Sequence, residues 1–157
     1  METALTTAEN TKLENTVVQY IVVDIGNERY GIDIKYVDNI VRMQKITRVP
    51  KAQDYFIGVI NIRGEVLPVM SVRRRFKIDD DVITGKTRII ILKNDQGMVG
   101  ILVDAVREVI TFGEDELEKN STDNANDKVY VGMVGKHGDQ LVSILSISAL
   151  LTEKEPS

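Results

Sequence analysis

The amino-acid sequence predicts an all-β protein made of two similar small barrels that share a hydrophobic core. Of its 157 residues, 20 are valine and 18 are isoleucine, whereas aromatic residues account for 5%. Branching at Cβ favours strands over helices. Short runs of these residues alternate with turn residues, and two segments recur along the chain with similar spacing. The predicted folded unit covers residues 16–152, between polar flexible tails at 1–15 and 153–157.

Eight short runs rich in β-branched residues predict the strands. Four of the segments between them can close hairpins, because glycine and asparagine readily adopt a positive φ. These segments are Gly26-Asn27, Arg63-Gly64, 94–97 and 137–139. The predicted strands cover residues 17–25, 29–32, 55–62, 65–72, 88–92, 99–103, 129–134 and 141–145.

The second half of the chain repeats two segments of the first half. Residues 31–34 (GIDI) correspond to 100–103 (GILV) at an offset of 69, and 57–60 (IGVI) correspond to 131–134 (VGMV) at an offset of 74. Arg63 then matches His137, and a polar insertion at 119–128 accounts for the difference between the offsets. The repeat predicts two barrel halves, about 16–85 and 86–152, with about five strands each. A closed barrel removes the exposed edges of a sheet.

Short helical turns are predicted after each repeated glycine segment, because apolar residues recur there at spacings of three and four. Ser146 can cap a short C-terminal helix that carries apolar residues on one face and covers a barrel end. The residues in question are Val37, Ile40 and Val41 in the first turn, Val106, Val109 and Ile110 in the second, and Ile147, Leu150 and Leu151 in the helix.

The composition argues against several classes of protein. The chain has no cysteine, which excludes disulfides and thiolate chemistry and fits a reducing compartment. No apolar run approaches the roughly 20 residues that cross a bilayer, and the N-terminus lacks the pattern of a signal peptide, so we expect a cytoplasmic protein without membrane insertion. A barrel that binds nucleic acid is an alternative, but the net charge of −4 and the scattered aromatic residues do not favour it.

Candidate catalytic and metal-binding residues are few. The single histidine, His137, lies in a predicted turn, where we expect it to be exposed and without partners. The acidic run 79–81 lacks the ligand spacing of a calcium loop, and no glycine-rich phosphate loop is present. A small hydrolase therefore remains an alternative without support, and we predict no catalytic residue, no metal and no cofactor.

A binding surface is the remaining possibility. If the two predicted helical turns face each other across the twin barrels, Val37, Ile40, Val106 and Val109 would line a cleft for an amphipathic helix of a partner. Ordinary core packing of these residues is the alternative, and periodicity alone favours it. Arg63 is a charged residue in a tight turn, and turn arginines are usually just exposed.

Residues 58–73, with the sequence GVINIRGEVLPVMSVR, closely resemble the signature of the CheW family of bacterial chemotaxis adaptors. The resemblance extends over about 16–152. It implies two SH3-like five-stranded β barrels joined about a common core. It also implies a scaffold that couples chemoreceptors to the chemotaxis histidine kinase, binds the receptor's cytoplasmic tip and the kinase's regulatory domain, and is recruited to membrane-associated receptor arrays. We expect the isolated protein to be a monomer.

The resemblance also implies two sets of contact residues. Asn61 and Gly64 would shape the turn that presents Arg63 to the receptor, whereas the kinase would contact first-half surface. The receptor-binding residues would be Val37, Ile40, Asn61, Arg63, Gly64, Val106 and Val109, and the kinase-binding residues Asn39, Val41, Arg42 and Gly58.

The sequence departs from the family pattern at Ser71, where an aspartate commonly stands two residues before the arginine. Because Ser71 has no carboxylate, it cannot form the ion pair with Arg73 that an aspartate would form. We therefore expect Arg73 to contact another partner or solvent. The same fold also occurs as the terminal domain of the kinase and fused to a receiver domain. A length of 157 residues favours the lone adaptor, because either partner domain would need about a hundred residues more.

Overall fold

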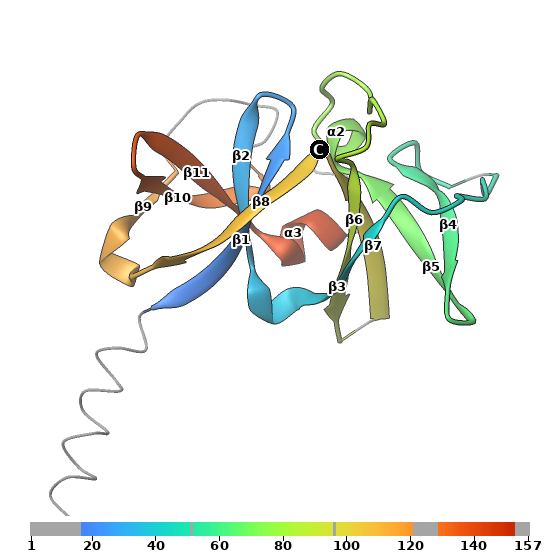
Figure 1. The fold of residues 1–157 in the computed structure, drawn as a ribbon, viewed down its shortest axis with the longest axis horizontal. Coiled ribbons are helices and arrows are strands. Elements are labelled where there is room, and N and C mark those ends of the chain that lie inside the picture. Colours follow the sequence, from blue (N-terminus) through green and yellow to red (C-terminus); the bar gives the residue numbers. More distant parts are fainter. Residues whose placement is uncertain (1–16, 51, 96, 121–128, 153–157) are drawn as a thin grey trace, which may run out of the picture.

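The computed structural model describes residues 17–50, 52–95, 97–120 and 129–152 (Figure 1). The predicted tails at 1–15 and 153–157, and most of the predicted polar insertion, lie outside the described residues. The described elements are mainly strands arranged in two sheets, with two short α-helices and two 3-10 turns. The prediction of an all-β fold is therefore confirmed.

The first sheet has six strands in the order β8-β1-β2-β11-β10-β9. β2 and β11 run parallel, and the other neighbours are antiparallel. The three-residue strand β9 adds a short edge to the five longer strands. The strands are β1 (Val18–Ile25), β2 (Glu28–Asp33), β8 (Ala105–Phe112), β9 (Leu117–Lys119), β10 (Val131–His137) and β11 (Gln140–Leu145).

The second sheet has five strands in the order β3-β6-β7-β5-β4, again with one parallel pair, β5 and β7. The segment that follows the edge strand β3 returns to the other edge strand, β4, through a bridge between Thr47 and Val59, in which each backbone N–H donates to the other residue's carbonyl at 2.9 and 2.8 Å. This bridge closes the sheet. The strands are β3 (Val37–Arg42), β4 (Phe56–Ile62), β5 (Glu65–Ser71), β6 (Arg88–Asn94) and β7 (Gly97–Val103).

The sequence repeat has a structural counterpart, but the sheets do not follow the division near residue 85. β1 and β2 occupy the same places in the first sheet as β6 and β7 in the second, and the hairpins β10–β11 and β4–β5 also correspond. Within each sheet, strands from both halves of the chain pair together. After β2 the chain passes from the six-stranded sheet to the five-stranded sheet, where β3 pairs with β6. After β7 it passes back, and β8 pairs with β1.

The predicted helical turns at 37–41 and 106–110 are wrong, because both segments form strands. A 3-10 turn, η1 (Ile34–Tyr36), precedes β3, and both strands contain a β-bulge. An extra residue in a strand shifts its alternation, so that residues three apart face the same side. Val37 opposes Leu92 while Ile40 opposes Ile90, and this spacing of three imitates a helical period.

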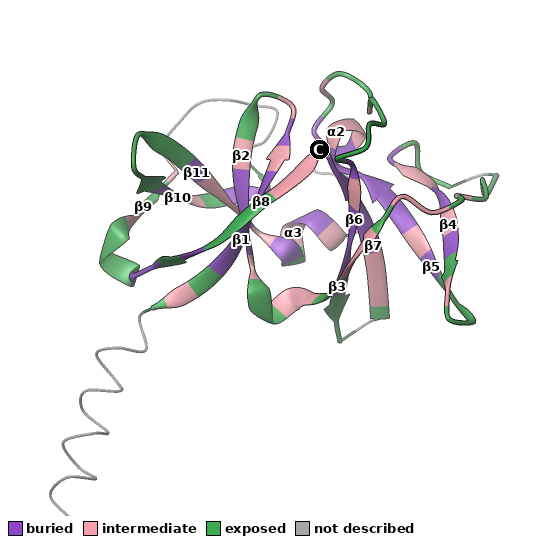
Figure 2. Ribbon diagram, in the orientation of Figure 1, coloured by how far each residue is buried: buried purple, intermediate pink, exposed green. Residues whose placement is uncertain are grey.

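One apolar cluster joins the two sheets. It contains Ile21 and Val23 of β1 together with Ile90 and Leu92 of β6, and all four are at most 5% exposed. The helix α3 (Ile147–Leu151) lies between the sheets and adds buried side chains to the same cluster (Figures 1 and 2). Ser146 caps it by accepting from the Ala149 N–H at 3.4 Å, in agreement with the predicted cap. The second helix, α2 (Val72–Arg75), begins after Ser71.

Candidate partner-binding surface

Four apolar residues predicted to bind a receptor lie where the two sheets meet. Val37 and Ile40 come from β3 in the five-stranded sheet, and Val106 and Val109 come from β8 in the six-stranded sheet. Val37, Ile40 and Val106 pack against the apolar cluster that both sheets share. We call this line of four residues the inter-sheet seam.

The seam residues are neither sealed inside nor fully exposed. Val106 opposes Val23 and Val109 opposes Ile21, so β8 turns both side chains toward the shared cluster. Val37, Ile40 and Val106 are half-buried, and Val109 is 51% exposed. The first three therefore contribute to the core and also reach the surface, whereas Val109 is available to a partner.

The hairpin between β4 and β5 presents Arg63. Both central residues have a positive φ, 55° at Arg63 and 85° at Gly64, as a tight hairpin turn requires. The side-chain oxygen of Asn61 accepts a hydrogen bond from the Gly64 N–H at 2.9 Å. Asn61 and Gly64 thus build the turn, and Arg63 projects from it with an exposed side chain.

Arg63 lies apart from the inter-sheet seam. It borders a hollow of about 210 Å³ at the end of the five-stranded barrel, and among the described residues no member of the seam lines this hollow. Asn39, predicted to contact the kinase, lies beside Arg63 there. The structure therefore brings together residues that the prediction assigned to different partners. The lining residues are Asp38, Asn39, Ile62, Arg63, Glu65, Leu67, Ile91 and Met98.

The predicted kinase-binding residues differ in accessibility. Asn39 and Arg42 are exposed on β3. Val41 packs against the interior of the five-stranded barrel and is only half-buried. Gly58 is buried, and a Cβ added at this position would lie only 2.2 Å from the carbonyl oxygen of Thr47. Gly58 therefore has a packing role in the closing bridge, and Asn39 and Arg42 are the members of the set that offer exposed side chains.

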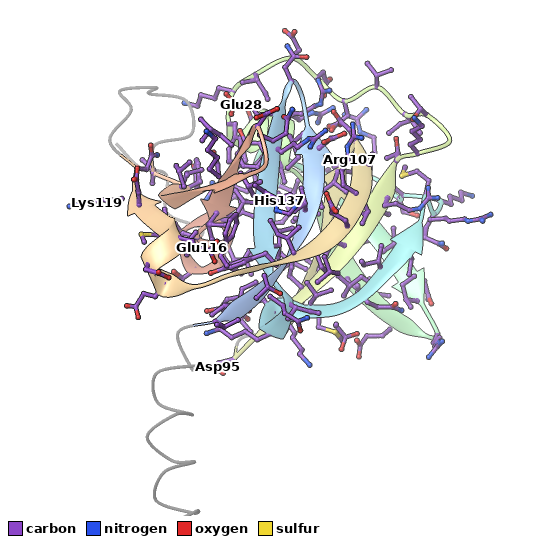
Figure 3. The ribbon with its side chains drawn as sticks, turned by 60° about the vertical axis from the view of Figure 1, so that its left-hand side comes forward. Glu28, Asp95, Arg107, Glu116, Lys119 and His137 are labelled. Carbon is purple, nitrogen blue, oxygen red and sulfur yellow. The ribbon has the colours of Figure 1, made fainter. Side chains whose placement is uncertain are left out.

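His137 has a partner that the sequence analysis missed. His137 is labelled in Figure 3. Its Nε2 atom lies 4.0 Å from Oε2 of Glu108, and both side chains are about half exposed. The expectation of an exposed residue is correct, and Glu108 is a nearby carboxylate that this expectation did not include. Glu108 stands 69 residues after Asn39 and His137 stands 74 after Arg63, so the internal repeat could have indicated this pair at the end of the other barrel.

Arg73 pairs with Asp104 in place of the missing family aspartate. Its Nη2 and Nε atoms donate to the two carboxylate oxygens of Asp104 at 2.6 and 3.2 Å. The side chains of Arg73 and Asp104 are 15% and 25% exposed. Oδ2 of Asp104 also accepts from the backbone N–H of Gly26 at 2.8 Å. Asp104 thus ties α2, next to the five-stranded sheet, to the β1–β2 turn of the six-stranded sheet.

The Ser71 hydroxyl binds a carboxylate from a different part of the chain. The Ser71 hydroxyl donates to Oδ2 of Asp81, which lies in the segment between α2 and β6. Burial raises the pKa of Asp81, and the neighbouring carboxylates of Asp80 and Asp104 act in the same direction, whereas the hydrogen bond from Ser71 lowers it.

Replacing Asp81 by asparagine should change how stability depends on pH. Because the pKa of Asp81 is higher in the folded than in the unfolded protein, its ionisation costs stability as the pH rises through the range above 3.8. An asparagine oxygen still accepts from Ser71 but cannot ionise. Urea unfolding at about pH 4 and about pH 7 should therefore show the variant gaining stability relative to the parent protein as the pH rises. A difference that stays constant with pH would contradict this.

In the described ranges, no three histidine, cysteine, aspartate or glutamate side chains come together in a way that could bind an ion. None of the helices described is both long and apolar enough to span a bilayer.

Comparison with known proteins identifies the family. The model of the CheW-like domain matches residues 19–155. The chain belongs to the CheW-like family. Chemotaxis protein CheW of Bacillus subtilis is 37% identical over 138 residues, which cover 87% of this chain and 88% of that protein. Chemotaxis protein CheW of Helicobacter pylori is 32% identical over 136 residues, covering 86% and 82%.

A solved CheW structure has a similar fold. The crystal structure of the scaffolding protein TtCheW from Thermoanaerobacter tengcongensis superposes with a TM-score of 0.77 at 31% identity, and covers 82% of this chain and 88% of that one. The predicted resemblance to CheW is therefore confirmed, as is the predicted pair of small barrels.

Proposed function

We propose that this CheW-like protein is a non-catalytic cytoplasmic adaptor that couples chemoreceptors to the chemotaxis histidine kinase at membrane-associated arrays. The observation that carries the proposal is the match to the CheW-like domain over nearly the whole described chain, together with a fold like that of the scaffolding protein TtCheW. The sequence has no cysteine and a single histidine, so it offers few candidate catalytic residues. Arg63 and Val109 are exposed on the surface.

The receptor tip would bind along the inter-sheet seam. A receptor tip of helical coiled coil can present apolar side chains at spacings of three and four, and such a helix binds well to an apolar strip on a partner. Val109 is the most exposed of the four seam residues, and the half-buried Val37, Ile40 and Val106 would add smaller apolar areas. Strong binding by each single contact is not required, because many weak contacts act together in an array.

The five-stranded barrel would contribute a second, polar surface. Arg63 projects from its hairpin beside Asn39, and Arg42 lies exposed at the end of β3. We infer that the receptor and the regulatory domain of the kinase contact neighbouring parts of this barrel, with Arg63 toward the receptor and Asn39 and Arg42 toward the kinase. Val41 and Gly58 would influence kinase binding by supporting β3 rather than by direct contact.

Changing Val109 to aspartate should weaken receptor binding strongly and leave the fold intact. The variant places an unpaired charge on the apolar strip, which should lower the affinity for a soluble receptor fragment about tenfold or more. Val109 is 51% exposed, so the melting temperature should change little. Leu141→Asp is the matched control, since Leu141 is 64% exposed but lies on β11, in the β10–β11 hairpin. Equal losses in both variants would contradict a site on the seam.

Changing Arg63 to histidine should reduce incorporation into assemblies of receptor and kinase. The residue in the corresponding hairpin is already histidine, and Arg63 buries little surface, so the thermal stability should be unchanged. Loss of one exposed charge contact should weaken binding by about two- to fivefold. Co-sedimentation with receptor-containing membranes and kinase measures this. The reciprocal exchange His137→Arg is the control, and normal co-sedimentation of the Arg63 variant would remove Arg63 from the site.

A further inference from the structure

A hollow lined by cations lies at one end of the inter-sheet seam. Its volume is about 330 Å³, and it lies between the start of β6 in one sheet and the start of β8 in the other. Arg107, at the beginning of β8, is labelled in Figure 3. The residues that line it are Asp24, Lys86, Arg88, Ala105, Val106 and Arg107, and we call it the cationic hollow.

Positive charge exceeds negative charge in this hollow. Asp24 supplies the one carboxylate in its lining, and this carboxylate already faces two arginines, Arg107 at 2.7 Å and Arg29 at 3.8 Å. Arg88 donates to the carbonyls of Gly85 and Thr87. Within the described ranges, neither Lys86 nor Arg88 pairs with a carboxylate. An excess of cations is unusual in a chain whose net charge is −4.

The pairing of β3 with β6 points independently to an anionic partner. Arg42 and Arg88 lie directly opposite each other in the antiparallel pair, so their side chains leave the same face of the sheet. Like charges at opposed positions destabilise a sheet. A bound carboxylate would relieve this repulsion, whereas the isolated protein has to tolerate it.

We propose that the cationic hollow binds acidic side chains of the helix that lies along the inter-sheet seam. This inference rests on the proposed receptor contact and adds the chemistry of the partner: an amphipathic segment whose apolar face is flanked by glutamate or aspartate. Val106 belongs to both the seam and the hollow, so one helix can contact both. A protein partner is favoured over nucleic acid because no aromatic side chain among the described residues lines the hollow for base stacking.

The test is charge reversal at Lys86 in the full chain. Lys86 is exposed and forms no ion pair in the described structure, so Lys86→Glu should fold normally. Its affinity for a soluble chemoreceptor cytoplasmic fragment should fall about tenfold at low salt, and its binding should depend less on salt than that of the parent protein. Lys86→Arg keeps the positive charge and should bind like the parent protein. The matched control is Lys93→Glu, which makes the same change at the other end of β6 and should bind normally.

The possible results separate this inference from the proposed function. If Val109→Asp weakens binding but Lys86→Glu leaves both affinity and salt dependence unchanged, the cationic hollow is not part of the receptor site, although the seam is. If the parent protein does not bind the receptor fragment, both proposals fail. If Lys86 is needed instead for binding to vesicles of anionic lipid without receptor, the hollow contacts a membrane and the proposed acidic helix is wrong.

Discussion

Gly58→Ala is expected to destabilise the protein by about 3 kcal/mol, because the added methyl group has no space. Its carbon would lie 2.2 Å from the carbonyl oxygen of Thr47 and 2.9 Å from Cγ2 of Ile46. The nearest atoms belong to the backbone carbonyl of Thr47, so rotating a side chain cannot relieve the clash. The clash falls on the two hydrogen bonds between Thr47 and Val59 that close the five-stranded barrel. Urea or thermal unfolding would measure the loss.

Gly132→Ala is the matched control for this prediction. Gly132 is the repeat equivalent of Gly58 and lies in the corresponding strand β10, but nothing lies within 4 Å of its added Cβ. Its stability should stay within about 0.5 kcal/mol of the parent protein. If Gly58→Ala folds with normal stability yet loses kinase binding, Gly58 would be a direct contact residue, and the packing role would be wrong.

Asp104→Ala is expected to cost about 1–3 kcal/mol, because it removes the carboxylate that accepts two hydrogen bonds from Arg73 in a partly buried ion pair. Arg73 would remain with its side chain 15% exposed and without its carboxylate, and the Gly26 N–H would lose its acceptor. Both sheets are tied through Asp104, so the variant should also weaken receptor binding by disturbing the seam. Denaturant unfolding and receptor titration would record the two effects.

Two further variants would show which interaction is responsible. Asp104→Asn keeps an oxygen for the Gly26 N–H but removes the charge, so it should fall between the parent protein and the alanine variant. Asp80→Ala removes one partner of the exposed ion pair between Arg74 and Asp80, whose side chains are 36% and 66% exposed. This variant should leave the unfolding midpoint nearly unchanged. Equal destabilisation by the alanine variants of Asp80 and Asp104 would contradict a special role for Asp104.

Much of the fold could be predicted from local patterns in the sequence. The strand runs, the four hairpin turns and the capped C-terminal helix depend on neighbouring residues, and the sequence repeat depends on simple comparison. β3 and β8 could not be assigned correctly in the same way. A bulge in each strand places Val37 with Ile40, and Val106 with Val109, at the spacing of a helix. Periodicity alone cannot distinguish these two structures.

The candidate surface was predictable where it follows the repeat and not where it depends on pairing between distant strands. The repeat pairs Val37 with Val106 and Ile40 with Val109, and all of these except Val109 pack on one shared cluster. The cationic hollow, by contrast, combines residues from β1, β6 and β8, and no local pattern relates Lys86 to Arg107. The proximity of Arg63 to Asn39 likewise follows from closure of the barrel.

The crossing of β3 and β8 between the sheets has a consequence for how the two halves depend on each other. A chain cut within the segment that joins α2 to β6 would give one piece with two of the six strands of the first sheet and another with two of the five strands of the second. Neither piece could complete a barrel alone, and each would carry the missing strands of its counterpart. The two fragments should therefore become ordered only as a mutual complement, which makes the molecule a single cooperative unit despite its internal duplication.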